Sequence, residues 1–168
     1  MTNAEYISLL EPITERLLHG GIFFTTKCGD VTNTMTIGWG GPTFYWGAPM
    51  FAAPIRPSRH SHALAWQSGE FTLSIPKPGE FAEALKLCGT KSGRDIDKFA
   101  AAGLSLQPGR EVSTPVIAGC ALHLECRVVM RQSIDPVNLI TPERLAKNYP
   151  SGDLHTLFYG QIVAHYEG

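Results

Sequence analysis

The feature that most constrains the fold is a long alternation of apolar and polar side chains in residues 120–132. From Cys120 to Met130 every second side chain is apolar or a thiol, and the intervening positions include His123, Glu125, Arg127 and Arg131. A period of two is typical of a β-strand with one face on the core and the other in solvent. We therefore predict a long strand here, with His123 exposed on its polar face.

Shorter segments predict the remaining elements. Apolar residues at three- and four-residue steps predict a helix over residues 3–19, with Asn3 as its cap and Pro12 as a point where it can kink. Residues 21–38 fit a hairpin around Gly29-Asp30, because β-branched and aromatic residues flank that turn. Further strands are predicted in 43–55, 70–76 and 154–166, a helix over 58–68 capped by Ser58, and helical stretches in 79–89, in 94–103 and after Thr141-Pro142.

No repeat, low-complexity tract or long linker divides the sequence, so we predict one domain over residues 1–168. Its class is mainly β (α+β), with antiparallel strands that dominate and helices between them. Closure into a small barrel would hide the strand edges.

Composition argues against several classes of protein. The 168 residues carry a formal net charge of -1, whereas nucleic-acid binding needs a basic face. No apolar run approaches the ~20 residues that span a bilayer, and the first residues lack the pattern of a signal peptide. We therefore expect no nucleic-acid partner, no membrane partner and a cytoplasmic location. The four cysteines contain no CxxC pair, and we expect them to be buried free thiols.

Two short basic segments are candidate anion sites. Arg56, Ser58 and Arg59 open a predicted helix, whose first backbone amides are free to bind an anion. The alternative is a solvated loop with Ser58 as an ordinary cap. The second segment joins two helical stretches and places cations around small hydroxylated residues, with Lys91, Ser92 and Arg94 as its members. The alternative there is a polar connection.

Residues 33–39, with the sequence NTMTIGW, are a candidate edge for a flat ligand. Thr34 and Thr36 share one face of the predicted strand with Gly38. Their hydroxyls and free backbone groups suit the donors and acceptors on the edge of a heteroaromatic ring, with Met35 or Trp39 packed nearby. The alternative is a solvent-facing threonine ladder.

Among the histidines, His155 is the best candidate for a site, because it begins the last predicted strand. His60 and His62 are two residues apart on a predicted helix and point in nearly opposite directions, so we predict no metal site there. The sequence also lacks GxGxxG, Walker, HExxH and GxSxG motifs. A cofactor held by a Rossmann domain is therefore not expected.

Taken in order, the segments NTMTIGWGG, PIRPSRHSHALAWQSGEFTLSIP, LCGTKSGRDIDKF, TPVIAGCALHLEC and YPSGDLHTLFYGQIV resemble the flavin reductase-like FMN-binding split-barrel family. The flavoredoxin-type branch is the most similar, and the resemblance runs from about Gly21 to Tyr166. It implies a small antiparallel Greek-key split β-barrel with peripheral helices. It also implies FMN as the cofactor and a homodimer with the flavin near the dimer interface.

The resemblance assigns roles to the candidate residues. It implies contacts to the flavin ring from Thr34, Thr36 and Ile37. It implies cofactor contacts from Arg56, Ser58 and Arg59, and phosphate contacts from Lys91, Ser92 and Arg94. His155 matches a position near the reactive face of the flavin, which makes it the candidate catalytic residue.

Three functions remain open. The first is an NAD(P)H-dependent flavin reductase, in which NADH or NADPH passes a hydride from nicotinamide C4 to flavin N5. The second is a non-enzymatic FMN electron carrier that serves a redox protein partner. The third is a small barrel that has lost its cofactor and acts as an interaction module, and the intact cluster of cations counts against it. No motif separates NADH from NADPH as donor.

Overall fold

The protein is described here from a computed structural model that covers residues 1–168. Seven strands form one antiparallel sheet in the order β2-β1-β5-β8-β9-β4-β3. In chain order these strands are β1 (Ile22–Cys28), β2 (Val31–Ile37), β3 (Gly41–Tyr45), β4 (Ala48–Ile55), β5 (Glu70–Ile75), β8 (Leu122–Ser133) and β9 (Thr156–Glu167). A second, two-stranded sheet pairs β6 (Leu106–Gln107) with β7 (Val116–Ile117).

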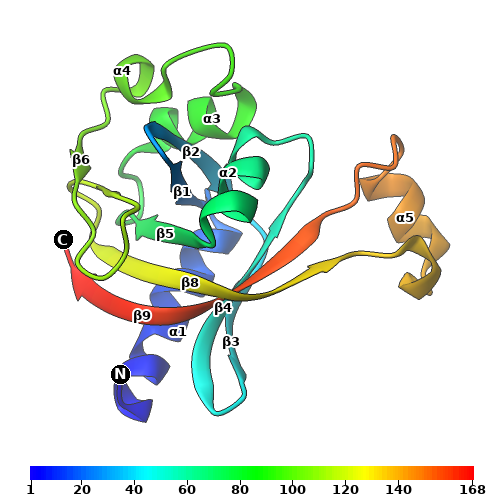
Figure 1. Cartoon of the computed structure of the whole chain (residues 1–168), viewed down its shortest axis with the longest axis horizontal. Helices are drawn as coiled ribbons and strands as arrows, with labels where there is room; N and C mark the ends of the chain where they lie inside the picture. Colours follow the sequence, from blue (N-terminus) through cyan, green and yellow to red (C-terminus); the bar gives the residue numbers. More distant parts are fainter.

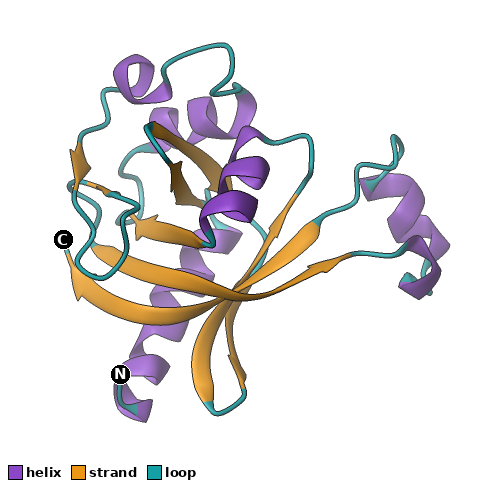
Figure 2. Cartoon of the chain, in the orientation of Figure 1, coloured by secondary structure: helices purple, strands orange, loops and turns teal.

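The helix α1 (Asn3–Leu18) precedes the first strand, and four further α-helices lie between strands: α2 (His60–Ser68), α3 (Ala82–Thr90), α4 (Lys98–Ala102) and α5 (Pro142–Asn148). A short 3-10 helix, Pro136–Asn138, precedes α5. Figure 2 shows strands that dominate the body and helices at its periphery, which confirms the predicted mainly-β class. The strands β2 and β3 are the two edges of the large sheet and do not pair with each other, so the barrel is not closed.

Strand β1 lies between two apolar clusters. Phe24 stacks on Phe71 with 4.8 Å between ring centroids, inside the larger cluster. Its neighbour Phe23 points to the other face and packs in a smaller cluster with Leu85 of α3 and Ile117 of β7. Both phenylalanines are fully buried. Burial of both faces of β1 fixes the position of its outer neighbour, the edge strand β2.

The alternation in residues 120–132 forms β8, but its polar face is buried over the first half of the strand. His123 and Glu125 have exposed fractions of 0%, so the prediction of an exposed His123 is wrong. The segment before β7 covers this face, because the Glu125 carboxylate accepts hydrogen bonds from the backbone N–H groups of Arg110, Glu111 and Val112. His123 Nδ1 lies 3.1 Å from the Ser74 hydroxyl.

Two helix caps differ from the sequence prediction. Helix α1 begins under a capping box made by Thr2 and Glu5, not under Asn3, and it continues through Pro12. Helix α2 has Arg59 at its cap position, with no side-chain cap bond. Ser58 does not cap α2, because its hydroxyl donates to Asp153 Oδ2 at 2.6 Å instead.

The four cysteines are free thiols; Cys88, Cys120 and Cys126 are buried, as expected, whereas Cys28 is partly exposed. None of the helices has the length and apolar character needed to cross a membrane.

Strands β8 and β9 run side by side across the molecule and lead into an arm that projects from the body (Figure 1). The arm consists of residues 134–154 and carries the helix α5. At its root the Ile134 N–H donates to the His155 carbonyl at 2.9 Å. The arm therefore starts and ends at one fixed point beside β4, which pairs with β9 from Met50 to Ile55.

Candidate functional site

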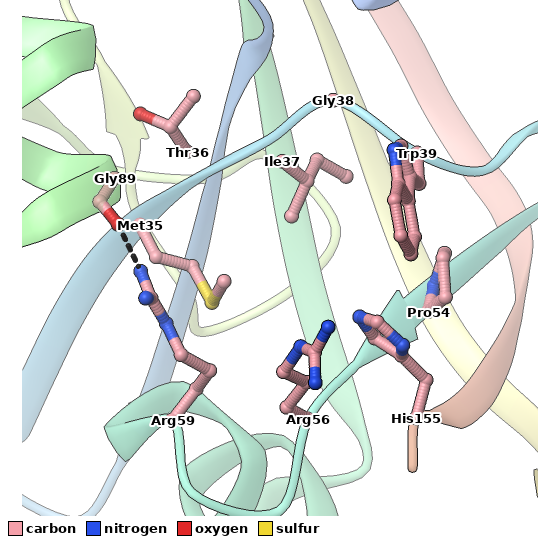
Figure 3. Close-up of a pocket in the computed structure, with 10 residues that line it drawn as sticks. All are labelled: Met35, Thr36, Ile37, Gly38, Trp39, Pro54, Arg56, Arg59, Gly89 and His155. Carbon is pink, nitrogen blue, oxygen red and sulfur yellow. Dashed lines mark hydrogen bonds between the residues drawn. The ribbon is translucent and has the colours of Figure 1, made fainter. Parts of the chain in front are cut away.

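A cavity of about 240 Å³ lies against the edge strand β2. We call it the β2 cavity. Its lining comes from five places in the chain and consists of Met35, Thr36, Ile37, Gly38, Trp39, Pro54, Arg56, Arg59, Gly89 and His155. Figure 3 shows Met35 and Arg59 on one side of this space, Trp39, Pro54 and His155 on the other, and Arg56 between them.

The edge position of β2 gives this cavity its polar wall. One side of an edge strand has no neighbouring strand, so its backbone groups are free for other partners. The Thr34 carbonyl accepts a hydrogen bond from Lys98 Nζ at 2.9 Å, which places this backbone group on the free side. Thr36 lines the cavity, and its hydroxyl donates to the Leu85 carbonyl of α3 at 2.6 Å. Helix α3 therefore covers part of the free edge and leaves the rest open to the cavity.

A second cavity of about 200 Å³ adjoins the first, and Met35 and Arg59 line both. We call it the cation cavity. Its lining consists of Asn33, Met35, Ser58, Arg59, His60, Ser61, Thr90, Lys91, Ser92, Gly93 and Lys98. Two lysines, an arginine and several hydroxyl groups are present in this set, and aspartate and glutamate are absent from it. Such a donor set binds anions.

Arg59 stands between the two cavities. Its Nη2 donates to the Gly89 carbonyl at the end of α3, at 2.8 Å. Burial lowers the pKa of this guanidinium, and the nearby charge of Arg56 lowers it further. A guanidinium keeps its proton throughout the physiological range, so Arg59 presents a fixed positive charge to both cavities.

Arg56 holds the root of the arm against the β2 cavity. It donates from Nη1 to the Asp153 carbonyl at 3.0 Å and from Nη2 to the Asn148 carbonyl at 2.8 Å. Its guanidinium carbon also lies 5.0 Å from the centroid of the Tyr149 ring. Much of its donor capacity is therefore used within the protein.

His155 lies in the wall opposite Met35 and has only 7% of its surface exposed. Its Nδ1 is 2.8 Å from the Tyr149 hydroxyl, and its ring centroid is 5.2 Å from that of Trp39. Burial, with a further contribution from the charge of Arg56, lowers the pKa of His155 to about 4. The imidazole is therefore neutral at physiological pH and can donate or accept a hydrogen bond in the cavity.

The structure gathers most of the residues that the sequence singles out. Thr36, Ile37, Arg56 and His155 line the β2 cavity, Ser58, Lys91 and Ser92 line the cation cavity, and Arg59 lines both. Thr34 and Arg94 line neither. The Thr34 hydroxyl is buried against that of Thr25 at 3.1 Å. Arg94 donates from Nη1 to the Ser58 carbonyl at 2.9 Å and so supports the loop behind the cation cavity.

Several lining residues escape the sequence analysis. Lys98 is the most important, since this lysine lines the cation cavity from α4. His60 also lines the cation cavity, whereas His62 lies 3.1 Å from the Thr156 hydroxyl through Nε2. Asn33 donates to the Ser61 hydroxyl at 2.7 Å. Lys98 lies in the segment KSGRDIDKF, which carries the family resemblance, and this could have marked it as a site residue. A lysine in a short amphipathic helix is usually solvated, however, so its burial could not be expected.

The cation cavity has features that fit a phosphate group. His60 Nδ1 is buried and has no hydrogen-bond partner. Gly93 allows the loop to approach β2 closely, because a Cβ at that position would lie 1.9 Å from Asn33 Oδ1. An orphaned buried nitrogen among cations, with the backbone brought close by a glycine, is the arrangement expected of an anion site.

Comparisons with known proteins identify the fold and the family. Three solved structures have the same fold. Flavoredoxin of Desulfovibrio vulgaris (Miyazaki F) is 23% identical with a TM-score of 0.70, and the match covers 89% of this chain and 70% of that one. An FMN-binding protein of Thermus thermophilus, with bound 1-cyclohex-2-enone, is 21% identical with a TM-score of 0.69 and coverages of 89% and 70%. An NADH:FAD oxidoreductase of Streptomyces globisporus C-1027 is 19% identical with a TM-score of 0.65 and coverages of 89% and 76%.

These structures confirm the split-barrel fold. The family is identified from the sequence. The model of the flavin reductase like domain matches residues 15–168, which is nearly the whole chain and includes every residue of the two cavities. The chain therefore belongs to the flavin reductase-like family.

Proposed function

We propose that this protein binds FMN across the two joined cavities and acts as an NAD(P)H-dependent flavin reductase. The observation that carries the proposal is that Met35 and Arg59 line both cavities. A cavity with a strand edge on one wall thus lies directly beside a cavity rich in cations. A flat ring with a phosphate on a short chain matches this pair of spaces.

The residues of the β2 cavity suit an isoalloxazine ring. Met35 and Ile37 offer apolar surface, and the free edge of β2 offers backbone donors and acceptors. Arg56 and Arg59 place positive charge along the same space. We propose ring contacts from Thr36 and Ile37, and a supporting role for Thr34 through its carbonyl bond to Lys98.

The residues of the cation cavity suit the phosphate group. We propose that Arg59, Lys91 and Ser92 hold its oxygens. Ser58 faces this cavity too, and its bonds to Asp153 fix the RPSR loop. Arg94 would support the phosphate site indirectly, because it donates to the Ser58 carbonyl and so stabilises the RPSR loop. A dianionic phosphate would supply the negative charge that the lining of this cavity lacks.

When bound, FMN would supply the redox chemistry by accepting a hydride at N5 from nicotinamide C4. The protein's part is to hold the two rings together and keep water away. His155 and Trp39 line the side of the β2 cavity opposite Met35 and Arg59 (Figure 3). We propose that the neutral imidazole of His155 orients the hydride donor by a hydrogen bond.

An FMN electron carrier that serves a protein partner is the second candidate. The indole of Trp39 borders the β2 cavity and is 50% exposed. An exposed aromatic ring beside a redox site gives a partner protein a surface on which to dock. The structural likeness to a flavoredoxin is in keeping with this role.

An absorption spectrum of the purified protein with FMN distinguishes these candidates. Flavin bands that bleach when NADH or NADPH is added without oxygen support the reductase. Bands that persist with both donors, but bleach with dithionite, support the carrier. Absence of any bound flavin after FMN is added would overturn both.

We also propose that two copies of the chain associate. Val137 and Ile140 on the arm are 77% and 93% exposed, and Trp46 at the tip of the β3–β4 hairpin is 69% exposed. Exposed apolar side chains on projecting segments are typical of a surface that another protein chain covers. Light scattering coupled to size exclusion should give twice the chain mass of 18.3 kDa; a monomer would contradict the proposal.

A further inference from the structure

Lys98 is a buried ammonium group bound only to neutral partners. The residue is 4% exposed. Its Nζ donates to the Thr34 carbonyl of β2 at 2.9 Å and to the Cys88 carbonyl of α3 at 3.0 Å. An ammonium group has three protons, and the two carbonyls account for two of them. The third donor remains, and Lys98 is one of the residues that line the cation cavity.

No counter-ion accompanies this charge. The one contact of ion-pair geometry in the structure joins His19 to Glu15, far along the chain from Lys98, and it is an ion pair only when His19 is protonated. Asp30, Asp95 and Asp97 share a neighbouring cavity with Lys98 but form no ion pair with it. The Asp97 carboxylate instead accepts from the N–H groups of Phe99 and Ala100. A buried charge without a partner is costly, and the cost falls when an anion arrives.

The other groups that face the cation cavity add positive charge. From the start of α2 come Arg59 and His60, and from the loop after α3 comes Lys91. Arg94 lies behind this loop. The Cys88 thiol of α3 does not line the cavity but lies near Lys98, and burial raises its pKa, which favours the neutral thiol. Burial also lowers the pKa of His60, and the charges of Arg94 and Lys98 lower it further, so the neutral imidazole is favoured.

We propose that Lys98 is the residue that selects a phosphorylated flavin over riboflavin, with the ligand's phosphate dianion as the counter-ion of its buried ammonium group. This inference rests on the proposed function, because it names a recognition residue of the same site. It adds a contact from α4, which lies outside the RPSR and KSGR segments.

The environment of Lys98 couples ligand binding to a proton. Burial lowers the pKa of Lys98 to about 8, and the charge of Arg59 adds to this effect. A bound dianion stabilises the charged form and raises the pKa again. Near pH 8.5, therefore, the free protein has largely lost this proton and the complex regains it. The affinity for FMN should fall by up to about tenfold per pH unit above pH 8.5, while the affinity for riboflavin stays constant.

Calorimetric titration of the wild-type protein tests the coupling without any substitution. FMN and riboflavin are each titrated at pH 7 and pH 8.5, in two buffers that differ in ionisation enthalpy. We expect uptake of about half a proton or more with FMN at pH 8.5, little at pH 7 and none with riboflavin. The phosphate is already a dianion at both values. No uptake with FMN at pH 8.5, or equal uptake with riboflavin, would overturn the proposal.

Three variants test whether Lys98 recognises the phosphate of the flavin. Lys98→Gln should weaken FMN binding at pH 7 at least tenfold and leave riboflavin binding within twofold. Lys98→Arg keeps the charge but does not titrate, so it should retain the preference for FMN and lose the proton uptake. Lys77→Gln removes an exposed lysine outside both cavities and should change neither property. Equal losses for FMN and riboflavin in Lys98→Gln would show a structural role only and would sink the proposal.

Failure of the proposed function gives a different result. If the wild-type protein binds neither FMN nor riboflavin, the flavin proposal fails, and inorganic pyrophosphate becomes the probe for Lys98. Thermal stabilisation by pyrophosphate that is lost in Lys98→Gln would still support an anion site at this residue. Equal stabilisation of both proteins would overturn that as well.

Discussion

The hydroxyl of Tyr149 lies 2.8 Å from Nδ1 of His155. Tyr149 directly follows helix α5 in the arm as its C-cap residue, whereas His155 immediately precedes strand β9 in the body. The bond therefore fixes the orientation of the imidazole in the wall of the β2 cavity. Arg56 strengthens this link, because it packs on the Tyr149 ring and donates to the carbonyl of Asn148.

Replacement of Tyr149 by phenylalanine tests this bond. Loss of one partly buried hydrogen bond should lower the free energy of unfolding by about 1 kcal/mol. Urea denaturation gives the value, with Tyr45→Phe as the matched control. The Tyr45 hydroxyl has no protein partner, and its residue is 47% exposed. Equal stability of the two variants would contradict a structural bond between Tyr149 and His155.

Acidification should destabilise the protein partly through His155. Its pKa is about 4 in the folded protein because of burial, against about 6.5 in an unfolded chain. Between these values the unfolded chain takes up a proton and the folded chain does not, so stability falls as the pH drops from 6.5 towards 4. The contribution is roughly 3 kcal/mol at most.

The comparison of His155→Gln with the wild type isolates this contribution. The free energy of unfolding of His155→Gln should fall less than that of the wild type between pH 6.5 and pH 4. Burial also lowers the pKa values of His60, His62 and His123, so both proteins should still lose some stability over this range. His19→Gln is the control, since 69% of the His19 side chain is exposed. Parallel pH profiles for wild type and His155→Gln would refute the assignment.

Two arginines that look equivalent in the sequence should differ in their effect on FMN binding. Arg59 lines both cavities, and Arg94 lines neither. Loss of a charge-assisted hydrogen bond costs about 1.5–3 kcal/mol, so Arg59→Ala should weaken FMN binding by about 10- to 100-fold. Arg94→Ala should weaken it by much less. Fluorescence quenching of FMN measures both dissociation constants, and a larger loss for Arg94→Ala would reverse the assignment.

The buried carboxylate of Glu125 should be essential for stability and dispensable for the site. It accepts from three backbone N–H groups and from the Tyr166 hydroxyl at 2.7 Å. Glu125→Gln turns one acceptor into a donor that faces other donors, so the free energy of unfolding should fall by about 2 kcal/mol or more. The exposed Glu167→Gln is the control. A change in FMN affinity with unchanged stability would contradict this prediction.

The strands could be predicted from the sequence because their patterns are local. The hairpin around Gly29-Asp30 and the long strand β8 follow from β-branched residues, turn residues and alternation. The burial of His123 could not be predicted, because it depends on a segment that precedes β7 and on the serine of another strand. A period of two shows that a strand has two different faces, but not what covers each of them.

For the site, too, the sequence predicts the features that depend on local composition and does not predict those that depend on distant contacts. The segments that approach the cavities have marked local composition, and the family resemblance named most of them. The role of Ser58 was misjudged because its partner, Asp153, lies far along the chain. Lys98 was missed because a lysine on a short helix is normally solvated, and its burial results from the packing of α4 against β2 and α3. This packing depends on tertiary structure, so the local sequence around Lys98 does not indicate it.

The attachment of the arm has a consequence for how relatives of this protein can diverge. The Arg56 bonds to the carbonyls of Asn148 and Asp153, and the Ile134 bond to His155, close the arm at its root. Insertions or deletions within residues 135–138 would therefore leave the wall of the β2 cavity in place, whereas Leu139, Glu143 and Arg144 share a cavity with Trp39 and tie the rest of the arm to that wall. The start of the arm is therefore the segment whose length and surface chemistry can vary while the root that holds His155 stays fixed.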